Sequence, residues 1–275
     1  LQLYILTLSY VVKICIVIEK NAIKLYLCIQ FLSINQYSIL MDFNLTEEHL
    51  MVRDAARDFA QTELLPGVIE RDEKQQFPKE LVRKMGELGF MGIMVSPKYG
   101  GSGMDAISYA LIMEELSKID ASASVIVSVN NSLVCYGLEA YGNEEQKQKY
   151  LTKLATGEFV GAFCLSEPEA GSDATSQKTT AIDKGDYYLL NGTKNWITNG
   201  GRADVYLVIA QTDKDKGHRG INAFIIEKGM EGFKAPEIHG KWSLRASATG
   251  ELVFEDVKIP KENILPGVKG LKGPL

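Results

Sequence analysis

The sequence predicts an α+β protein, in which an N-terminal all-α domain is followed by a domain built as an antiparallel β-barrel or β-sandwich. From residue 41 to about residue 157 the apolar residues recur at helical spacing, and Pro and Gly separate the runs. From residue 160 onward apolar residues occur in short runs that Gly, Asp and Lys turns divide, which is typical of sandwiches and barrels. We therefore predict a helical domain at residues 41–159 and a β domain at residues 160–265.

The composition is that of a globular protein with enough apolar material for a core. The chain has 275 residues, of which 45% are hydrophobic and 24% charged, and its net charge is −5. An acidic balance without a basic block argues against nucleic acid as a partner. The four cysteines include no Cys-x-x-Cys pair and the three histidines are isolated. This pattern argues against a disulfide framework or a zinc site and favours a reducing, cytoplasmic compartment.

Residues 1–40 differ from the rest of the chain. Residues 1–18 and 22–34 are each mostly apolar, with one lysine as the only charged residue, and the first run is about long enough to span a bilayer. Lysines follow this run and no small-residue cleavage site ends it, so a signal peptide fits poorly. We predict that translation starts at Met41 and that residues 1–40 are an unfolded or non-native leader. The alternative is a membrane anchor.

Start and stop signals define five predicted helices. Thr46 is expected to cap the first helix, which Pro66-Gly67 ends, and Gly89 is expected to end the second. The fourth is small and apolar nearly all round, which predicts a buried helix. Glu114 and Glu115 are predicted to lie on a solvated helix face. The predicted helices span residues 46–65, 79–88, 106–119, 121–141 and 144–155.

Six strands are predicted in the second domain. Asn191-Gly192 lies between two apolar runs and is a strong hairpin signal. Because side chains alternate along a strand, Trp196 and Thr198 are expected on the same face. The predicted strands span residues 160–166, 187–190, 193–198, 205–211, 222–227 and 251–257.

Residues 163–173, FCLSEPEAGSD, form the loop stretch, an apolar strand that leads into a loop. Pro168 ends the strand, and the small residues that follow can bring backbone N–H groups close to a phosphate. The strand stretch, residues 191–201, supplies the flat ring of Trp196 and the hydroxyl of Thr198. Together they suit a planar cofactor that carries a pyrophosphate, although spacing alone fits an ordinary loop beside a hairpin as well.

Other motifs favour structural interpretations. Residues 101–106 match a Gly-x-Gly-x-x-Ala dinucleotide fingerprint with Asp120 near the ribose-binding distance, but no strand leads directly into the glycines, so we interpret them as a loop between helices. Ser166 and Ser172 lack the Gly-x-Ser-x-Gly context of a hydrolase nucleophile. Arg245 and Ser247 could bind an anion, but a salt bridge or a turn is the favoured interpretation.

The loop stretch and the strand stretch resemble the paired flavin-binding signatures of the acyl-CoA dehydrogenase family, and the similarity extends from about residue 41 to the C-terminal end. This resemblance implies a helical domain, a middle β domain and a C-terminal helical bundle, with FAD between the last two. The bundle is absent from this sequence, and residues 266–275 would begin the linker to it. The family's catalytic Glu would lie beyond residue 275, so no catalytic residue is assigned.

The resemblance also assigns site residues by position. Ser172 would bind substrate near the pantetheine–phosphate end of CoA, and Thr198 would lie near the reactive N5 edge of the flavin. Ser166 stands where Thr is commoner in the family, a change that keeps the hydroxyl. The residues expected to bind FAD are Phe163, Leu165, Ser166, Gly171, Ser172, Trp196, Ile197 and Thr198.

The implied reaction is the α,β-dehydrogenation of an acyl-CoA in fatty acid β-oxidation. A carboxylate removes the α proton while the β hydrogen leaves as hydride to the flavin, and the electrons pass to an electron-transfer flavoprotein. The family resemblance also implies a homotetramer without a membrane partner. Without the C-terminal bundle, the chain is expected to bind FAD poorly and not to turn over, so a catalytically inactive remnant is one alternative.

The substrate class has two candidate answers. Residues 41–228 resemble short-chain, butyryl-type enzymes, whereas residues 229–275 resemble the glutaryl-CoA branch. That branch holds the distal carboxylate with an Arg in the buried helix, and the matching position here is Ser124. Residues 121–141 contain no Arg or Lys. A dianionic substrate would lack its counter-charge, so a short, uncharged acyl chain is favoured and glutaryl-CoA is the alternative.

Overall fold

The computed structural model describes residues 2–8, 12–19, 22–28, 44–268 and 270. These residues divide into two compact units, residues 1–45 and residues 46–275. The predicted start at Met41 lies outside the described residues, as does most of the predicted linker at residues 266–275.

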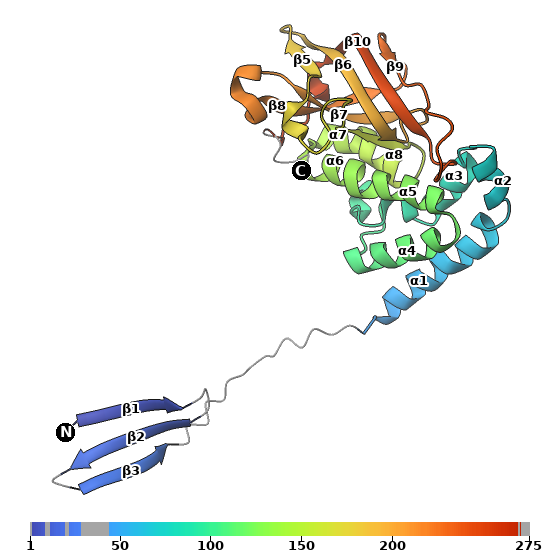
Figure 1. Cartoon of the computed structure of the whole chain (residues 1–275). Helices are drawn as coiled ribbons and strands as arrows, with labels where there is room; N and C mark the ends of the chain where they lie inside the picture. Colours follow the sequence, from blue (N-terminus) through green and yellow to red (C-terminus); the bar gives the residue numbers. More distant parts are fainter. Residues whose placement is uncertain (1, 9–11, 20–21, 29–43, 269, 271–275) are drawn as a thin grey trace. The chain divides into compact units, whose positions relative to one another are not determined.

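The first unit contains a three-stranded antiparallel sheet of order β1-β2-β3 (Figure 1). An unfolded or non-native leader was predicted here, with a membrane anchor as the alternative. The described residues are not unfolded but form strands, because Ile, Val and Tyr, which favour extended backbone, occur throughout them. The strands are β1 (Gln2–Leu8), β2 (Val12–Glu19) and β3 (Ala22–Cys28).

The second unit begins with the helical domain, whose five predicted helices are confirmed. Three of them contain a π-helical turn, at Ala60–Leu64, Asn130–Cys135 and Lys147–Leu151. One short helix, α2, follows Pro66-Gly67 and was not predicted. The helices are α1 (Glu47–Phe59), α2 (Val68–Glu73), α3 (Lys79–Glu87), α4 (Ala106–Ile119), α5 (Ala121–Val129), α6 (Tyr136–Tyr141), α7 (Glu144–Gln146) and α8 (Thr152–Ala155).

The α5–α6 helix connects the helical domain to the β domain. Its residues Val134 and Leu138 belong to the same apolar core as Leu207 and Ile225 of the sheet, and Figure 1 shows α5 to α8 beneath the strands. Among the described residues, Ala121–Tyr141 is the one helix long and apolar enough to cross a membrane, yet 61% of its most apolar window is buried within the protein. The prediction of a buried helix is confirmed.

The N-termini of α1 and α4 are joined by side-chain caps. Thr46 accepts from His49 N at 3.2 Å, and His49 Nε2 lies 2.9 Å from Asp105 Oδ2. Asp105 in turn accepts from Ser108 N at 2.8 Å and caps α4. The residues before this cap connect two helical segments, so the interpretation of residues 101–106 as a loop is confirmed.

Asp105 supplies a pH-dependent part of the stability. The backbone N–H of Ser108, and then His49, lower the pKa of Asp105 to about 2. A depressed carboxyl pKa stabilises the fold above the unfolded pKa, and this contribution is lost as pH falls through the folded pKa. Asp105→Asn keeps a cap but does not titrate, so its deficit in urea denaturation should be present at pH 6 and largely gone at pH 2. An equal deficit at both pH values would contradict this account.

The prediction of a solvated Glu pair on α4 is right for one residue and wrong for the other. Glu114 is exposed, but Glu115 is buried. Glu115 accepts from Arg57 Nη2 and from Lys118 Nζ, each at 2.9 Å, and the hydrogen bond from Arg57 is the main reason that its pKa is lowered. Arg57 comes from α1, so the pairing depends on a contact between distant segments that helical spacing does not reveal.

The β domain is a seven-stranded sheet of order β4-β7-β5-β6-β10-β9, with β8 paired to β7. Most neighbours are antiparallel, but β4 runs parallel to β7, and β5 has one parallel bridge to β7. The prediction of an antiparallel β domain after the helical domain is confirmed for most strand pairs, the parallel pairs of β7 are the exception, and β5 and β9 were not predicted. The strands are β4 (Gly161–Cys164), β5 (Thr180–Asp183), β6 (Tyr187–Thr198), β7 (Val205–Gln211), β8 (Ile221–Glu227), β9 (Phe233–Lys234) and β10 (Thr249–Pro260).

The predicted hairpin at Asn191-Gly192 is wrong, because both residues lie in the middle of β6, a continuous strand of 12 residues. Asn191 exchanges two hydrogen bonds with Asp256, from Asn191 Nδ2 at 3.0 Å and to Asn191 Oδ1 at 2.9 Å. Asp256 lies at a register shift of β10 and has a φ of 51°. The Asn-Gly pair therefore accommodates a bulge in the neighbouring strand, a requirement that local turn signals do not reveal.

Gly192 should not tolerate a side chain. Its φ is 145°, and a Cβ there would lie 2.5 Å from Thr179 Oγ1 and 2.7 Å from Thr179 Cα. Gly192→Ala is expected to lower the free energy of unfolding by about 2–3 kcal/mol, because it combines backbone strain with overpacking. Urea denaturation measures the loss, and Gly171→Ala, where a Cβ would meet nothing within 4 Å, is the matched control with little expected change.

Candidate functional site

The loop stretch and the strand stretch lie against each other in the fold. Asn195 N, in β6, donates a hydrogen bond to Ser166 O at 2.9 Å. The sheet order separates β4 from β6 by two other strands, so this contact comes from the loop that follows β4. The two segments that the sequence analysis singled out are thus brought together.

The end of β6 presents an aromatic ring to solvent. Trp196 is 65% exposed, whereas Ile197 is buried and Thr198 is partly exposed. Lys194, two residues before Trp196, is fully buried, so side chains do not simply alternate at this end of β6. The shared face of Trp196 and Thr198 stays a prediction. Trp196 has a φ of 60°, and the register with β10 shifts between Gly250 and Leu252. An exposed Trp on a sheet is an informative observation, since large aromatic side chains are generally covered.

The remaining residues of the loop stretch form a turn with free polar groups at its tip. Glu167 and Ala170 exchange backbone hydrogen bonds at 3.0 and 3.2 Å. Gly171 and Ser172 then lie exposed, and a Cβ on Gly171 would meet nothing within 4 Å. An open, small-residue tip, in a loop whose base contacts the strand with the exposed Trp196, fits a planar cofactor with a phosphate-bearing tail. FAD is therefore chemically compatible with the residues present.

Phe163 and Leu165 point toward the helical domain. Both are partly buried and pack against the core shared by the sheet and the α5–α6 helix. Phe163 lines an apolar cavity of about 150 Å³ together with Leu133, Tyr136 and Leu207. Leu133 and Tyr136 are exposed on the helix side. An apolar cavity of roughly this size holds a benzene-sized group.

A buried ion pair underneath the two stretches was missed by the sequence analysis. Lys194 is fully buried, and its Nζ lies 2.8 Å from Glu167 Oε1, 2.9 Å from Leu165 O and 3.2 Å from Gln177 Oε1. Burial lowers the pKa of Lys194, and the charge of Glu167 opposes that shift. Burial also acts to raise the pKa of Glu167, but Lys194 and neighbouring hydrogen bonds hold it below its ordinary value. The signal in the sequence that could have indicated this pair was a lysine at a strand position that faces the core.

Arg245 forms the structural salt bridge that was favoured for it. Its Nε lies 3.1 Å from Asp72 Oδ2, and its backbone N donates to Asp72 Oδ1 at 3.0 Å. Ser247 is buried. These contacts join the segment before β10 to α2, which is the structural role that was favoured for Arg245.

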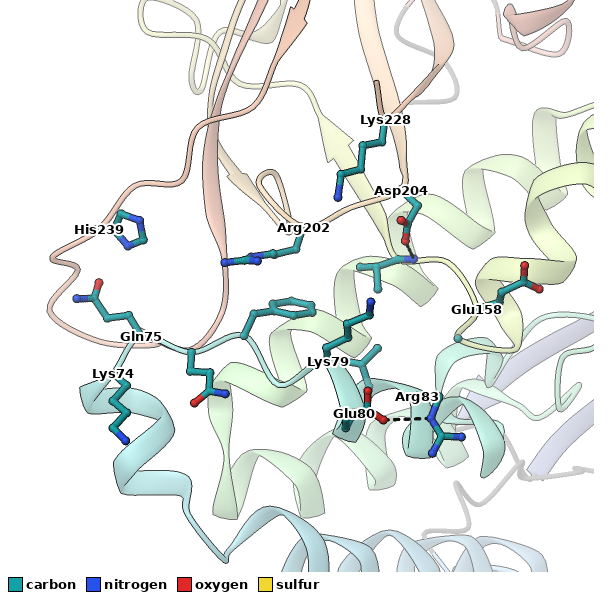
Figure 2. Close-up of a pocket in the computed structure, with 15 residues that line it drawn as sticks. Lys74, Gln75, Lys79, Glu80, Arg83, Glu158, Arg202, Asp204, Lys228 and His239 are labelled. Carbon is teal, nitrogen blue, oxygen red and sulfur yellow. Dashed lines mark hydrogen bonds and ion pairs between the residues drawn. The ribbon is translucent and has the colours of Figure 1, made fainter. Parts of the chain in front are cut away.

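A larger cavity lies elsewhere, between α3 and the β domain, with a volume of about 830 Å³. Figure 2 shows Lys79, Arg202 and Lys228 around it, with Asp204 beside Lys228. Arg202 forms an ion pair with Glu237. None of the residues predicted to contact FAD lines this cavity, and within the described part of the chain no cluster of His, Cys, Asp and Glu could hold a metal ion.

Comparison with protein families agrees with the resemblance. The family model "Acyl-CoA dehydrogenase, N-terminal domain" matches residues 46–158, and "Acyl-CoA dehydrogenase, middle domain" matches residues 162–257. The "Acyl-CoA dehydrogenase, short-chain specific" of Clostridium acetobutylicum is 49% identical over 235 residues, which are 86% of this chain and 62% of the relative. The chain thus spans about three fifths of the length of the curated relatives that it matches.

Solved structures share the fold. A chain in a structure described as the electron transferring flavoprotein of Acidaminococcus fermentans is 52% identical, with a TM-score of 0.81 over 84% of this chain and 60% of that one. A glutaryl-CoA dehydrogenase from Mycobacterium smegmatis in complex with FADH2 is 41% identical, with a TM-score of 0.80 over 84% of this chain and 58% of that one. With both signature stretches in contact and both domains matched in order, the chain belongs to the acyl-CoA dehydrogenase family.

Proposed function

We propose that this chain forms the FAD-binding and acyl-CoA-binding portion of an enzyme that dehydrogenates a short, uncharged acyl-CoA. The observation that carries the proposal is the contact between the loop stretch and the strand stretch, which places Ser166 against β6 next to the exposed Trp196. The FADH2 named for the Mycobacterium smegmatis structure supports FAD as the cofactor.

The residues of this chain would bind and orient the cofactor. When bound, FAD would accept the hydride from the β carbon of the acyl group. Trp196, Thr198 and the backbone of Ile197, whose side chain is buried in the sheet core, would cover the flavin ring, with the Thr198 hydroxyl near its N5 edge. Phe163, Leu165, Ser166, Gly171 and Ser172 would complete the FAD site, and the Ser172 hydroxyl would also bind the pantetheine–phosphate end of CoA. The chain supplies orientation and hydrogen bonds, while no residue within it is assigned as the base.

A short, uncharged acyl chain fits the buried helix. Ser124 occupies the position where the resemblance places an Arg in the glutaryl-CoA branch, and it is buried, with its Oγ 2.7 Å from Ser117 Oγ. Ala121–Tyr141 carries no Arg or Lys, so a distal carboxylate would be desolvated without a partner. The name of the Clostridium acetobutylicum relative supports the short-chain class. The alternative of glutaryl-CoA is favoured by residues 229–275 and by the glutaryl-CoA dehydrogenases among the similar structures, one of which is a complex with glutaryl-CoA.

An electron-transfer flavoprotein would accept the electrons. The Acidaminococcus fermentans structure, which is described by that partner, supports this part of the proposal. A homotetramer in the cytoplasm completes the expected picture, without nucleic acid or a membrane as partner.

A graft tests the proposal. Residues 46–268 of this chain would be joined to the remaining C-terminal part of the Clostridium acetobutylicum relative. We expect a yellow protein that oxidises butyryl-CoA at least about tenfold faster than glutaryl-CoA, since an unpaired buried carboxylate costs several kcal/mol. The unmodified relative is the control. A folded graft without flavin would contradict the FAD site, and faster oxidation of glutaryl-CoA would contradict the substrate class.

The 275-residue chain alone is expected to bind FAD poorly and not to turn over, because the resemblance places the second wall of the FAD site and the base in the C-terminal helical domain. Flavin absorbance after gel filtration, and reduction of a dye by butyryl-CoA, measure the two properties. A flavin-loaded, active preparation of this chain would overturn that expectation, whereas a stable, flavin-free product in the native host would favour the catalytically inactive alternative.

A further inference from the structure

We propose that Lys194 is a positioning residue that fixes the loop stretch against β6, and so holds the flavin-contacting groups of both segments in one arrangement. The inference rests on the proposed function, which supplies the cofactor. Lys194 itself is fully buried, so it acts through the backbone that it holds and does not contact the flavin.

Lys194 donates hydrogen bonds to two residues of the loop stretch and to one residue that follows it. Its ammonium donates to Leu165 O at 2.9 Å, to Glu167 Oε1 at 2.8 Å and to Gln177 Oε1 at 3.2 Å. Leu165 and Glu167 flank Ser166, and Lys194 lies two residues before Trp196. The ammonium therefore links the residues on both sides of Ser166, whose hydroxyl is predicted to contact the flavin, to the strand that carries Trp196.

Glu167 closes the other side of the loop. Its carboxylate accepts from Lys178 N at 2.6 Å and from Thr179 N at 3.1 Å. Residues 168–177 therefore form a loop whose two ends are joined by the Glu167 side chain. The exposed tip with Gly171 and Ser172 lies within this closed segment. Fixing the base of a loop in this way limits the positions available to its tip.

Stability alone is a poor explanation for the pair. A buried ion pair is often no more stabilising than well-packed apolar residues of similar volume, because both charges lose their hydration. An ammonium with three acceptors fixes the relative orientation of the groups that it binds, since each hydrogen bond sets an angle as well as a distance. A surface pair nearby, Lys178 with Glu169, offers a contrast, because its lysine side chain is 73% exposed.

The test compares Lys194→Met, the double variant Lys194→Met/Glu167→Gln and the control Lys178→Met in the full 275-residue chain. Amide hydrogen exchange is followed at Asn195, which donates to Ser166 O, and at Ala170, which donates to Glu167 O. Both acceptors are backbone carbonyls, so none of the substitutions removes them. Thermal midpoints report the stability of the same proteins.

We expect Lys194→Met to lower the thermal midpoint and the double variant to regain most of that decrease, because in the double variant no charge stays buried without a partner. Its Asn195 and Ala170 amides should nevertheless exchange at least about tenfold faster than in the parent, because local opening at these amides costs less free energy. The control should match the parent. Parent-like protection of both amides in the double variant would overturn the inference and leave the pair a purely structural feature.

FAD titration by flavin fluorescence then connects the loop to the cofactor. The titration uses the graft described above, because the 275-residue chain alone is expected to bind FAD poorly. The double substitution should weaken FAD binding by the graft at least about tenfold at a temperature where both proteins are folded. Equal affinities would overturn the role toward the flavin. If the parent binds no FAD even in the graft described above, the proposed function fails, while the exchange data still decide whether Lys194 fixes the loop.

Discussion

Lys194→Met is expected to lower the free energy of unfolding by about 3–5 kcal/mol at neutral pH, the largest effect predicted for this protein. Removing one member of a buried ion pair leaves the other charge without a partner, and here that charge is Glu167, whose carboxylate is buried. Urea denaturation at pH 7 measures the loss. Lys178→Met, which removes a lysine from an exposed pair, should change the stability by less than about 1 kcal/mol.

The loss should depend on pH in a defined direction. In the parent the pKa of Glu167 lies below its ordinary value of 4.5, so its contribution is present above that pH and is lost as pH falls through the folded pKa. Without Lys194, burial is the main influence left on Glu167 and should raise its pKa. The variant then gains stability relative to the parent as the carboxyl protonates. If the difference in free energy of unfolding between parent and variant does not become smaller below pH 4.5, Glu167 is not the group responsible for the loss.

The most accurate predictions concern elements whose signals are local. The helix at residues 106–119 was placed to the residue, because Asp105 caps it and Asp120 ends it and caps the next helix. The strand at residues 205–211 was equally well placed. It is buried along its whole length, so an uninterrupted apolar run marks it. In both cases the residues that define the element lie within it or directly beside it in the sequence.

The errors concern elements that other segments define. Asn191-Gly192 has the local chemistry of a turn, yet the partner strand β10 and its bulge at Asp256 make it part of a long strand. The charge of Glu115 is buried because Arg57 of another helix reaches it. Tertiary contacts override local preference wherever the two disagree, and a single sequence carries no direct record of those contacts.

The candidate site divides in the same way. Spacing and resemblance predicted that the loop stretch and the strand stretch belong together, and the contact between Asn195 and Ser166 confirms their proximity. The pair beneath them was not predicted, because Glu167 and Lys194 are 27 residues apart in sequence. A charged residue within a strand pattern is a signal for such a pair, but it does not identify the partner.

Asn130→Leu carries the second largest expected effect, a loss of about 2–4 kcal/mol in the free energy of unfolding. Asn130 is fully buried. Its Nδ2 donates to Met91 O at 2.8 Å and to Leu154 O at 3.1 Å, and its Oδ1 accepts from Gly161 N at 2.9 Å. Leucine has a similar volume but removes the partner of Met91 O and of Gly161 N, at roughly 1–3 kcal/mol each. Leu154 O still accepts from Gly157 N at 3.2 Å.

The same substitution should loosen the connection between the two domains. Gly161 begins β4, while Met91 and Leu154 belong to the helical domain, so one amide holds three segments of the fold together. Urea denaturation should show the loss, and exchange of the Gly161 amide should accelerate more than exchange in α1. Ser132→Ala, in the same helix, removes a hydroxyl that bonds only to Ser128 O at 2.7 Å, and it should cost less than about 1 kcal/mol. A loss below about 1 kcal/mol for Asn130→Leu would mean that the neighbouring backbone rearranges to pair these groups, and that the amide does not hold the two domains together.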